Sequence, residues 1–174
     1  SIVNDSASTP EDTSVPIYVL SNDDPGSVGP LTITEINGTP ISSASPVVTI
    51  LDPVTGLPQG TVRLVDGGNT DPADDFLEFV PAPGFNGTVE PFTYTVEDGL
   101  GNELEGTVNV TVTPANDPPV ATDDSTVTPA GTPVSVDVLG NDNDPDGDTL
   151  TISEVNGTPI TSGGPAIPVP NGTV

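Results

Sequence analysis

The sequence contains no cysteine, histidine or methionine, and Arg63 is its only cationic side chain. Without cysteine the fold cannot use disulfides, so it must be held by its core, by bound metal or by assembly. Without Cys, His and Lys, and with no serine in a Gly-x-Ser-x-Gly motif, the usual catalytic nucleophiles and bases are missing. Carboxylate pairs remain available, but the acidic residues cluster in turns. We therefore predict that the protein is not an enzyme.

The formal net charge of −25 arises from 26 acidic residues and one cation. Nucleic acid is not expected as a partner, because affinity for it comes from Lys and Arg on phosphates. Attraction to an anionic membrane surface is not expected either, for the same reason, and no segment resembles a membrane span or a signal peptide. We expect an internal fragment or a mature segment of a larger protein. Adaptation to high salt is an alternative origin of the acidity, but it predicts acids spread over all surfaces.

The chain is rich in proline and glycine, with 22 and 19 residues, which favours either disorder or many short strands. Alternating apolar residues between the turns favour strands, since alternate side chains of a strand share one face. The clearest alternations are Val15, Ile17 and Val19; Phe92, Tyr94 and Val96; and Val108, Val110 and Val112. Further strands are expected at residues 1–7, 31–36, 45–51, 61–65 and 77–80. With no helical periodicity, this pattern predicts an all-β, immunoglobulin-like β-sandwich.

An internal repeat sets the domain organisation. Asn37-Gly38-Thr39-Pro40-Ile41 recurs as Asn156-Gly157-Thr158-Pro159-Ile160, an offset of 119 residues without a gap. The same offset relates Asn22-Asp23 to Asn141-Asp142. We predict a complete repeat at residues 1–113, a linker at 114–119 and the first half of a second repeat at 120–174. The second copy has its own alternating segments around Val134–Val138, Leu150–Ile152 and Ile167–Val169.

The second copy lacks counterparts of residues 77–113, so half of a sandwich would expose an apolar face and open strand edges. Two explanations remain open. The boundary of the fragment is artificial, or another chain supplies the missing strands by strand addition. The second explanation would make the protein a self-assembling filament subunit.

The most informative local stretch is acidic and runs from Asn141 to Asp148. Asp142, Asp144, Asp146 and Gly147 match the first half of an EF-hand calcium loop, Asp-x-Asp-x-Asp-Gly. The second half is missing, because the twelfth position is Ser153 and a strand-like run follows. Calcium takes six to eight oxygen ligands, so the stretch predicts half of a calcium site. The alternative is a solvated acidic turn, but carboxylates at this density repel one another unless a cation lies among them.

Longer motifs carry a family resemblance. The run from Ala115 to Asp124, the run from Val138 to Leu150, and Gly84-Phe85-Asn86-Gly87-Thr88 with residues 92–99 resemble the bacterial cadherin-like tandem repeats of large secreted (RTX-type) adhesins. The resemblance covers essentially the whole chain. It implies calcium-stiffened Ig-like modules in series, exported to the cell surface and used as extender segments. The first copy departs from the pattern because its loop lacks the Asp-x-Asp-Gly-Asp run, and the second has Ala130-Gly131 where the first has Glu11-Asp12.

Strand direction in an Ig-like sandwich suggests where the remaining calcium ligands lie. The turn at Glu11 and Asp12 is expected at the exit end of the first repeat, facing the linker and the entry end of the second. Cadherin-like families bridge successive domains with calcium in this way. The predicted ligands are Glu11, Asp12, Asn116, Asp117, Asn141, Asp142, Asp144, Asp146 and Asp148. The alternative is an ion held by the loop alone. The aspartates of the loop are ligands under both hypotheses.

We expect, from these observations, a calcium-stiffened spacer of an extracellular adhesin or surface fibre. Its expected partners are neighbouring repeats of the same chain or identical chains. A sandwich that binds a cell-surface glycan or protein is the alternative. That function needs an exposed aromatic platform, for which Phe85 is the best candidate among six aromatic residues.

Overall fold

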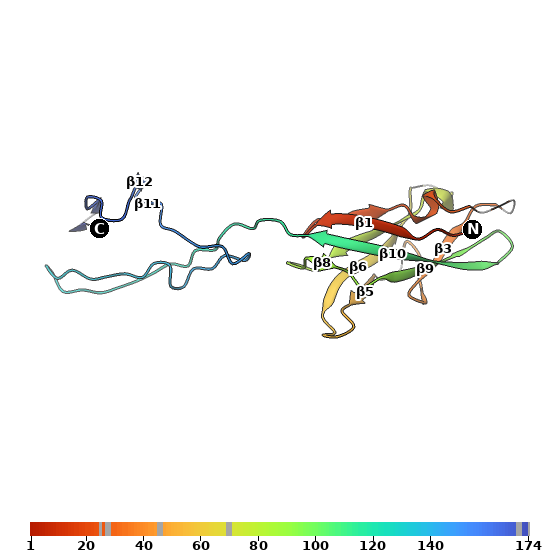
Figure 1. Ribbon diagram of the computed structural model, residues 1–174, viewed down its shortest axis with the longest axis horizontal. Helices are drawn as coiled ribbons and strands as arrows, with labels where there is room; N and C mark the ends of the chain where they lie inside the picture. Colours follow the sequence, from red (N-terminus) through yellow and green to blue (C-terminus); the bar gives the residue numbers. More distant parts are fainter. Residues whose placement is uncertain (25, 27–28, 45–46, 69–70, 170–171, 174) are drawn as a thin grey trace. The chain divides into compact units, whose positions relative to one another are not determined.

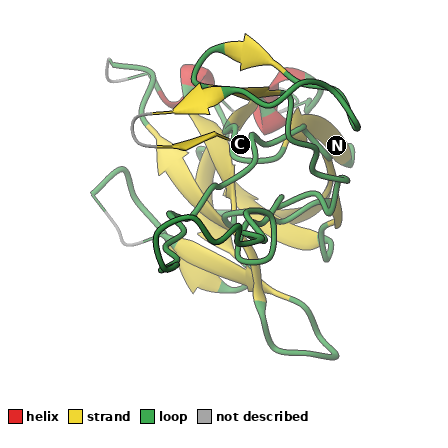
Figure 2. Ribbon diagram, turned by 90° about the vertical axis from the view of Figure 1, so that its left-hand side faces the viewer, coloured by secondary structure: helices red, strands yellow, loops and turns green. Residues whose placement is uncertain are grey.

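The computed structural model describes residues 1–24, 26, 29–44, 47–68, 71–169 and 172–173. The chain divides into two compact units, Ser1–Ala115 (unit 1) and Asn116–Val174 (unit 2). Within the described ranges the regular structure is β-strand apart from two 3₁₀ turns, η1 (Val19–Ser21) and η2 (Pro72–Asp74), which are red in Figure 2. No helix among these residues is long and apolar enough to cross a membrane.

Unit 1 is a sandwich of two sheets (Figure 1). One sheet has the order β1-β10-β9-β3-β4, with β8 also paired to β10. Its strands are β1 (Asp5–Pro10), β3 (Thr32–Ile36), β4 (Thr39–Pro40), β8 (Gly87–Thr88), β9 (Phe92–Glu97) and β10 (Glu103–Thr113). The other sheet has the order β2-β7-β6-β5. Its strands are β2 (Val15–Ile17), β5 (Val48–Leu51), β6 (Pro58–Val65) and β7 (Phe76–Pro81). The prediction of an all-β, Ig-like sandwich is confirmed.

The core lies between the two sheets and is built from alternate residues of each strand, as the sequence predicted. Phe92, Tyr94 and Val96 on β9 are completely buried. Every second residue of β10 from Val108 to Val112 is buried beside them. The facing sheet contributes Val62 and, from β7, Leu77 and Phe79. The alternations at residues 92–96 and 108–112 therefore identify the buried face of the first sheet correctly.

The strand β1 was predicted at residues 1–7, but it occupies Asp5–Pro10. It runs parallel to the end of β10, with Asp5 opposite Val108 and Pro10 opposite Thr113. The chain then turns at Glu11 and Asp12, as the sequence predicted. Pro10 is tolerated because β1 is the edge strand of its sheet.

Large rings lie over two glycines of the sandwich. Gly106 on β10 stands opposite Tyr94 on β9, and a Cβ atom at Gly106 would overlap the tyrosine ring. Gly60 on β6 stands opposite Pro81 on β7, and a Cβ atom at Gly60 would overlap the ring of Phe79 on the same strand. Both glycines leave room for a fully buried aromatic side chain, because they have no side chain of their own.

Unit 2 has few regular strands. It contains two short antiparallel pairs, β11 (Glu154–Val155) with β12 (Thr158–Pro159), and β13 (Pro168–Val169) with β14 (Gly172–Thr173). The strands expected around residues 134–138 and 150–152 are not formed. In unit 1 their counterparts pair with β7 and with β9. Residues 116–174 contain no counterpart of either partner strand, so these segments have no ladder to join.

Candidate functional site

The acidic loop of unit 2 is organised by its own carboxylates. Asp144 Oδ1 accepts hydrogen bonds from the backbone N–H groups of Asp146 and Asp148, at 3.0 and 3.3 Å. Its carbonyl accepts another from Gly147 at 3.1 Å, and Gly147 has a positive φ of 78° that suits glycine. The Asp-x-Asp-Gly-Asp sequence therefore forms a compact turn around the Asp144 side chain.

Two more carboxylates tie this loop to the start of unit 2. Asp146 Oδ2 accepts a hydrogen bond from the backbone N–H of Asp117 at 2.7 Å. Asp142 Oδ1 accepts one from the backbone N–H of Thr122 at 2.8 Å. The segment that enters unit 2 is thus held at two points by aspartates of the predicted calcium loop.

The other predicted residues of unit 2 lie around the same turn. Asn116 donates its side-chain amide to the carbonyl of Asp117 at 3.1 Å, and Asn141 donates to the carbonyl of Asp123 at 3.5 Å. Asp148 is exposed and takes part in the turn through its backbone N–H. Across the described residues, however, no group of three or more acidic side chains converges closely enough to hold a metal ion.

Glu11 and Asp12 belong to unit 1. Glu11 is buried, with 6% of its surface exposed, and its Oε1 accepts a hydrogen bond from the backbone N–H of Ala115 at 2.6 Å. Its Oε2 accepts a longer one, of 3.5 Å, from the side chain of Asn86. Asp12 has a positive φ of 56°, and its Oδ1 accepts a hydrogen bond from the backbone N–H of Gly84 at 3.1 Å. Both residues thus fix backbone near the end of unit 1.

A second polar cluster in unit 1 was not singled out from the sequence. The hydroxyl of Tyr94 lies 3.0 Å from Asp5 Oδ2, 3.0 Å from Asp23 Oδ2 and 3.3 Å from the carbonyl of Val3. One hydroxyl proton is thus shared among three acceptors. Burial raises the pKa of Asp5, with a smaller contribution from the charge of Asp23. Burial and the charge of Asp5 also raise the pKa of the Tyr94 hydroxyl.

The repeat could have revealed this cluster. Asn22-Asp23 of unit 1 is the counterpart of Asn141-Asp142, and both aspartates accept a backbone N–H bond from the preceding segment at 2.8 Å. Asn22 also donates its side-chain amide to Asp5 Oδ1 at 3.0 Å. Tyr94 was assigned to the core, which is correct for its ring but omits its hydroxyl.

The sequence suggested Phe85 as an exposed aromatic platform for glycan binding, and the structure does not support that suggestion. Phe85 is partly buried and packs against the hydrophobic core, so its ring is not an exposed platform. The exposed aromatic is Tyr18, with 55% of its surface accessible. Its ring lies 5.1 Å from that of Phe76, centroid to centroid.

Comparison with known proteins gives one family match. The family model described as the bacterial Ig domain matches residues 1–111 and 116–174. No curated protein matches the chain. Two solved structures are similar to it: the N-terminal Ig1-2 module of the Drosophila receptor protein tyrosine phosphatase DLAR, and tandem Ig repeats of Dlar. The first shares 16% sequence identity with a TM-score of 0.37, and the alignment covers 71% of this chain and 55% of that chain. The second shares 19% with a TM-score of 0.33, covering 71% and 54%.

Proposed function

The chain belongs to the bacterial Ig domain family, and we propose that it is a calcium-stiffened spacer module of an extracellular adhesin or surface fibre. Bacterial Ig domains are typical of surface proteins, and Ig-like modules are typically structural rather than catalytic. The proposed partners are neighbouring repeats of the same chain or identical chains. The proposed cofactor is Ca²⁺.

The observation that carries the proposal is that the acidic loop has no counter-charge within the chain. Arg63 is the only cationic side chain, and it is already paired with Glu78 on the neighbouring strand, at 2.5 Å. Unit 2 contains no Lys, Arg or His at all. The charge that balances Asp142, Asp144 and Asp146 must therefore come from a cation in solution.

The donors are of the type that calcium prefers, and calcium binding would draw together carboxylates that do not converge among the described residues. Asp142, Asp144 and Asp146 each use one carboxylate oxygen to accept a backbone N–H group, and the second oxygen of each can bind a hard cation at the same time. Asp142, Asp144 and Asp146 are the proposed central ligands, and Asp148, Asn141, Asn116 and Asp117 lie on the same turn or on the segment that it holds. Calcium would neutralise the loop and fix the entering segment.

The position of these residues in the sequence supports the proposed mechanical stiffening. Glu11 holds the backbone of Ala115, and Asp146 holds that of Asp117, so Asn116 alone separates the two fixed residues. A cation that binds the acidic loop would remove the repulsion that otherwise favours opening of the turn. We propose that a series of such repeats then behaves as a rod in calcium-containing fluid. Extracellular modules of this kind bind calcium at roughly 10⁻⁴–10⁻³ M.

Calorimetric titration of calcium, with magnesium as the comparison ion at equal ionic strength, tests the proposal. The wild-type protein is expected to bind calcium with a Kd of about 10⁻⁴–10⁻³ M, and its melting temperature should rise above that in excess chelator. Both effects should be lost in Asp144→Asn/Asp146→Asn. The matched control is Glu103→Gln/Glu105→Gln, which removes two exposed acidic charges from unit 1 and should retain calcium binding.

The same titration separates the two arrangements left open by the sequence. Glu11→Gln keeps the acceptor oxygen that holds Ala115 but removes the negative charge. Weaker calcium binding in this variant supports an ion shared with Glu11, whereas unchanged binding supports an ion held by the loop alone. If the wild type binds no calcium, or if the charge-matched control loses it equally, the calcium proposal is wrong.

A further inference from the structure

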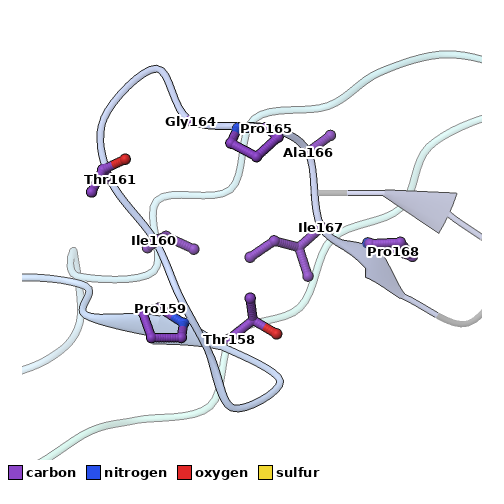
Figure 3. A pocket seen from close by; sticks show the side chains of 9 residues that line it. All are labelled: Thr158, Pro159, Ile160, Thr161, Gly164, Pro165, Ala166, Ile167 and Pro168. Carbon is purple, nitrogen blue, oxygen red and sulfur yellow. The ribbon is translucent and has the colours of Figure 1, made fainter.

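A hollow of about 240 Å³ in unit 2 has no acidic side chain in its wall. Figure 3 shows the side chains of Ile160 and Ile167 pointing toward one another across it. The carboxylates of unit 2 lie elsewhere, and one of them, Asp117, directly precedes a proline at the start of the unit. The peptide bond between Asp117 and Pro118 is of a type that an aspartate can break.

The chemistry of an Asp–Pro bond requires only the aspartate itself and water. A carboxylate oxygen attacks the carbonyl carbon of the same residue, a five-membered anhydride ring forms, and the proline nitrogen leaves. The bond to proline is a tertiary amide, and its nitrogen takes up the proton needed for departure more readily than that of other peptide bonds. The nucleophile and the carbonyl belong to one residue, so their orientation decides how readily the bond breaks.

The sequence contains five Asp–Pro bonds, and four of them share one local structure. In these four, the aspartate Oδ1 accepts a hydrogen bond of 2.8–3.0 Å from the backbone N–H of the second residue after it. The four pairs are Asp24 with Gly26, Asp52 with Val54, Asp71 with Ala73, and Asp144 with Asp146. Each of these carboxylates is thus held in an Asx turn.

An Asx turn makes the carboxylate a poorer nucleophile. Hydrogen bonds from the backbone of Thr55 and Val54 lower the pKa of Asp52, because they stabilise its charged form. Asp144 likewise accepts a second backbone N–H, from Asp148 at 3.3 Å. To attack its own carbonyl carbon, each of these carboxylates has to give up bonds that stabilise its charge and fix its direction.

Asp117 is the exception among the five, because the second residue after it is Pro119. Proline has no backbone N–H, so the hydrogen bond that holds the other four carboxylates cannot form at Asp117. This difference is fixed by the covalent structure of the segment Asp117-Pro118-Pro119 and does not depend on which other groups the Asp117 side chain contacts.

The groups around the Asp117 carbonyl favour the reaction. Asn116 Nδ2 donates a hydrogen bond of 3.1 Å to this carbonyl oxygen, on which negative charge develops when its carbon is attacked. The backbone N–H of Asp117 donates to Asp146 Oδ2 at 2.7 Å, so the residue is fixed on the side that precedes the reacting bond. Pro118 is exposed, so water has access to the products of the first step.

We propose that the chain cleaves itself between Asp117 and Pro118. The Asp117 carboxylate oxygen bonds to the carbonyl carbon of the same residue, the bond from that carbon to the Pro118 nitrogen breaks, and this nitrogen takes a proton from water. Water then opens the cyclic anhydride and leaves two carboxyl groups on Asp117. Each chain reacts once, so the reaction is processing and not enzymatic turnover. It separates the first repeat from the second and does not depend on the calcium proposal.

The test follows the full chain by mass spectrometry during warm incubation in one mildly acidic buffer with excess chelator and protease inhibitors. Two fragments are expected, residues 1–117 and 118–174, before any product of the other four Asp–Pro bonds. Asp117→Asn removes the nucleophile and should abolish both fragments. Asn116→Ala should slow their formation about tenfold, less than the loss of a buried oxyanion donor, because Asn116 is exposed.

Pro119→Ala tests the structural argument directly, because it keeps the reacting bond and supplies an N–H at the second residue after Asp117. The Asx turn seen at the other four bonds can then form, and cleavage should slow about tenfold, as expected for a hydrogen bond to a charged group. Pro114→Ala is the matched control. It also replaces an exposed proline near the start of unit 2, but it leaves residue 119 unchanged and should cleave at the wild-type rate.

Four results would overturn the proposal. Another Asp–Pro bond breaks first, the two fragments form equally fast in Asp117→Asn, or Pro119→Ala cleaves as fast as the wild type. The fourth is an intact wild-type chain under conditions in which a synthetic peptide of residues 114–121 is cut at its Asp–Pro bond. That peptide contains the same bond and shows that the buffer and the incubation time permit the reaction.

Discussion

Glu11 and Ala115 are joined by a hydrogen bond of 2.6 Å between the glutamate Oε1 and the alanine backbone nitrogen. The two residues are far apart in the sequence, and the bond holds the chain where it leaves strand β10. Glu11 also donates its own backbone N–H to the carbonyl of Thr113 at 2.9 Å, so the pairing of β1 with β10 continues through it. Its carboxylate is buried and satisfied by N–H groups rather than by a basic residue.

Replacing Glu11 by alanine is therefore expected to destabilise unit 1. The substitution leaves the N–H of Ala115 without its acceptor in a partly buried position, which costs about 1–3 kcal/mol in the free energy of unfolding. Urea denaturation followed by circular dichroism measures the change. Glu105→Ala is the control, because Glu105 is exposed on β10 and its loss should change stability by less than about 0.5 kcal/mol. Equal losses in the two variants would contradict the role assigned to Glu11.

Gly106→Ala is expected to destabilise unit 1 by about 1–3 kcal/mol, the usual range for overpacking. The added Cβ would overlap the ring of Tyr94, which is buried against the glycine and cannot move into solvent. Thermal unfolding of Asn109→Ala provides the control, since Asn109 is exposed on the same strand. A Gly106→Ala variant as stable as this control would show that the ring does not depend on the glycine.

The raised pKa of Asp5 predicts a pH dependence of stability. Burial disfavours the charged carboxylate in the folded state, so the folded protein binds the proton more tightly than the unfolded chain. Stability should rise as pH falls through the raised folded pKa, and the gain should be complete below the ordinary value of 3.8. Asp5→Asn should rise less steeply over this window. Chemical denaturation at a series of pH values checks the slope, with Ser6→Ala as a neighbouring, non-titrating control.

The lowered pKa of Asp98 predicts a pH dependence of stability opposite to that of Asp5. Hydrogen bonds from the side chain and backbone of Asn102, and from the backbone of Leu100, lower the pKa of Asp98 in the β9–β10 turn. Its stabilising contribution is present above 3.8 and is lost as pH falls through the lowered folded pKa. Asp98→Ala should therefore be less stable than the wild type at pH 7, and the difference should shrink in acid.

The control for Asp98 is Leu100→Ala, which alters the same turn at a side chain that is 73% exposed. Its stability relative to the wild type should be independent of pH. A difference between Asp98→Ala and the wild type that stays constant into acid would mean that the carboxylate charge does not stabilise the turn.

Strand positions could be predicted where alternation was strong. The segments around Phe92, Tyr94 and Val96, and around Val108, Val110 and Val112, form strands whose buried faces are those predicted. Val19 was predicted to extend β2, but it begins the 3₁₀ turn η1 while remaining completely buried. The alternation predicted the burial of Val19 correctly but not its backbone conformation. Burial depends on which face of the chain the side chain occupies, whereas strand conformation depends on whether the hydrogen-bonded ladder continues.

The acidic loop could also be located from the sequence, since Asp144 and Gly147 define their turn by contacts within a few residues. The contact between Asp117 and Asp146 spans 29 residues and was anticipated only as proximity to the linker. The cluster of Tyr94, Asp5 and Asp23 was missed. Tyr94 is separated from Asp5 by 89 positions and from Asp23 by 71, and no local pattern indicates which carboxylates face its hydroxyl.

The two units separate what the sequence determines from what tertiary structure decides. Local turns are identical in both: Asn37 and Asn156 have φ values of 48° and 49°. The hydroxyls of Thr9 and Thr128 each donate to the carbonyl four residues later, at 2.7 and 2.6 Å. These bonds close within a few residues, so each copy of the sequence forms them unaided.

Burial and strand pairing differ between the units although the sequences correspond. Ile17 is buried because β2 pairs with β7, which lies about 60 residues further along the chain. Its counterpart Val136 has the same apolar character but no such partner in unit 2, and it remains exposed. A strand ladder and a core need surfaces from distant segments, whereas a turn needs only its own residues. The sequence alone therefore determined the turns and the apolar faces, and the tertiary structure decided which of those faces became a core.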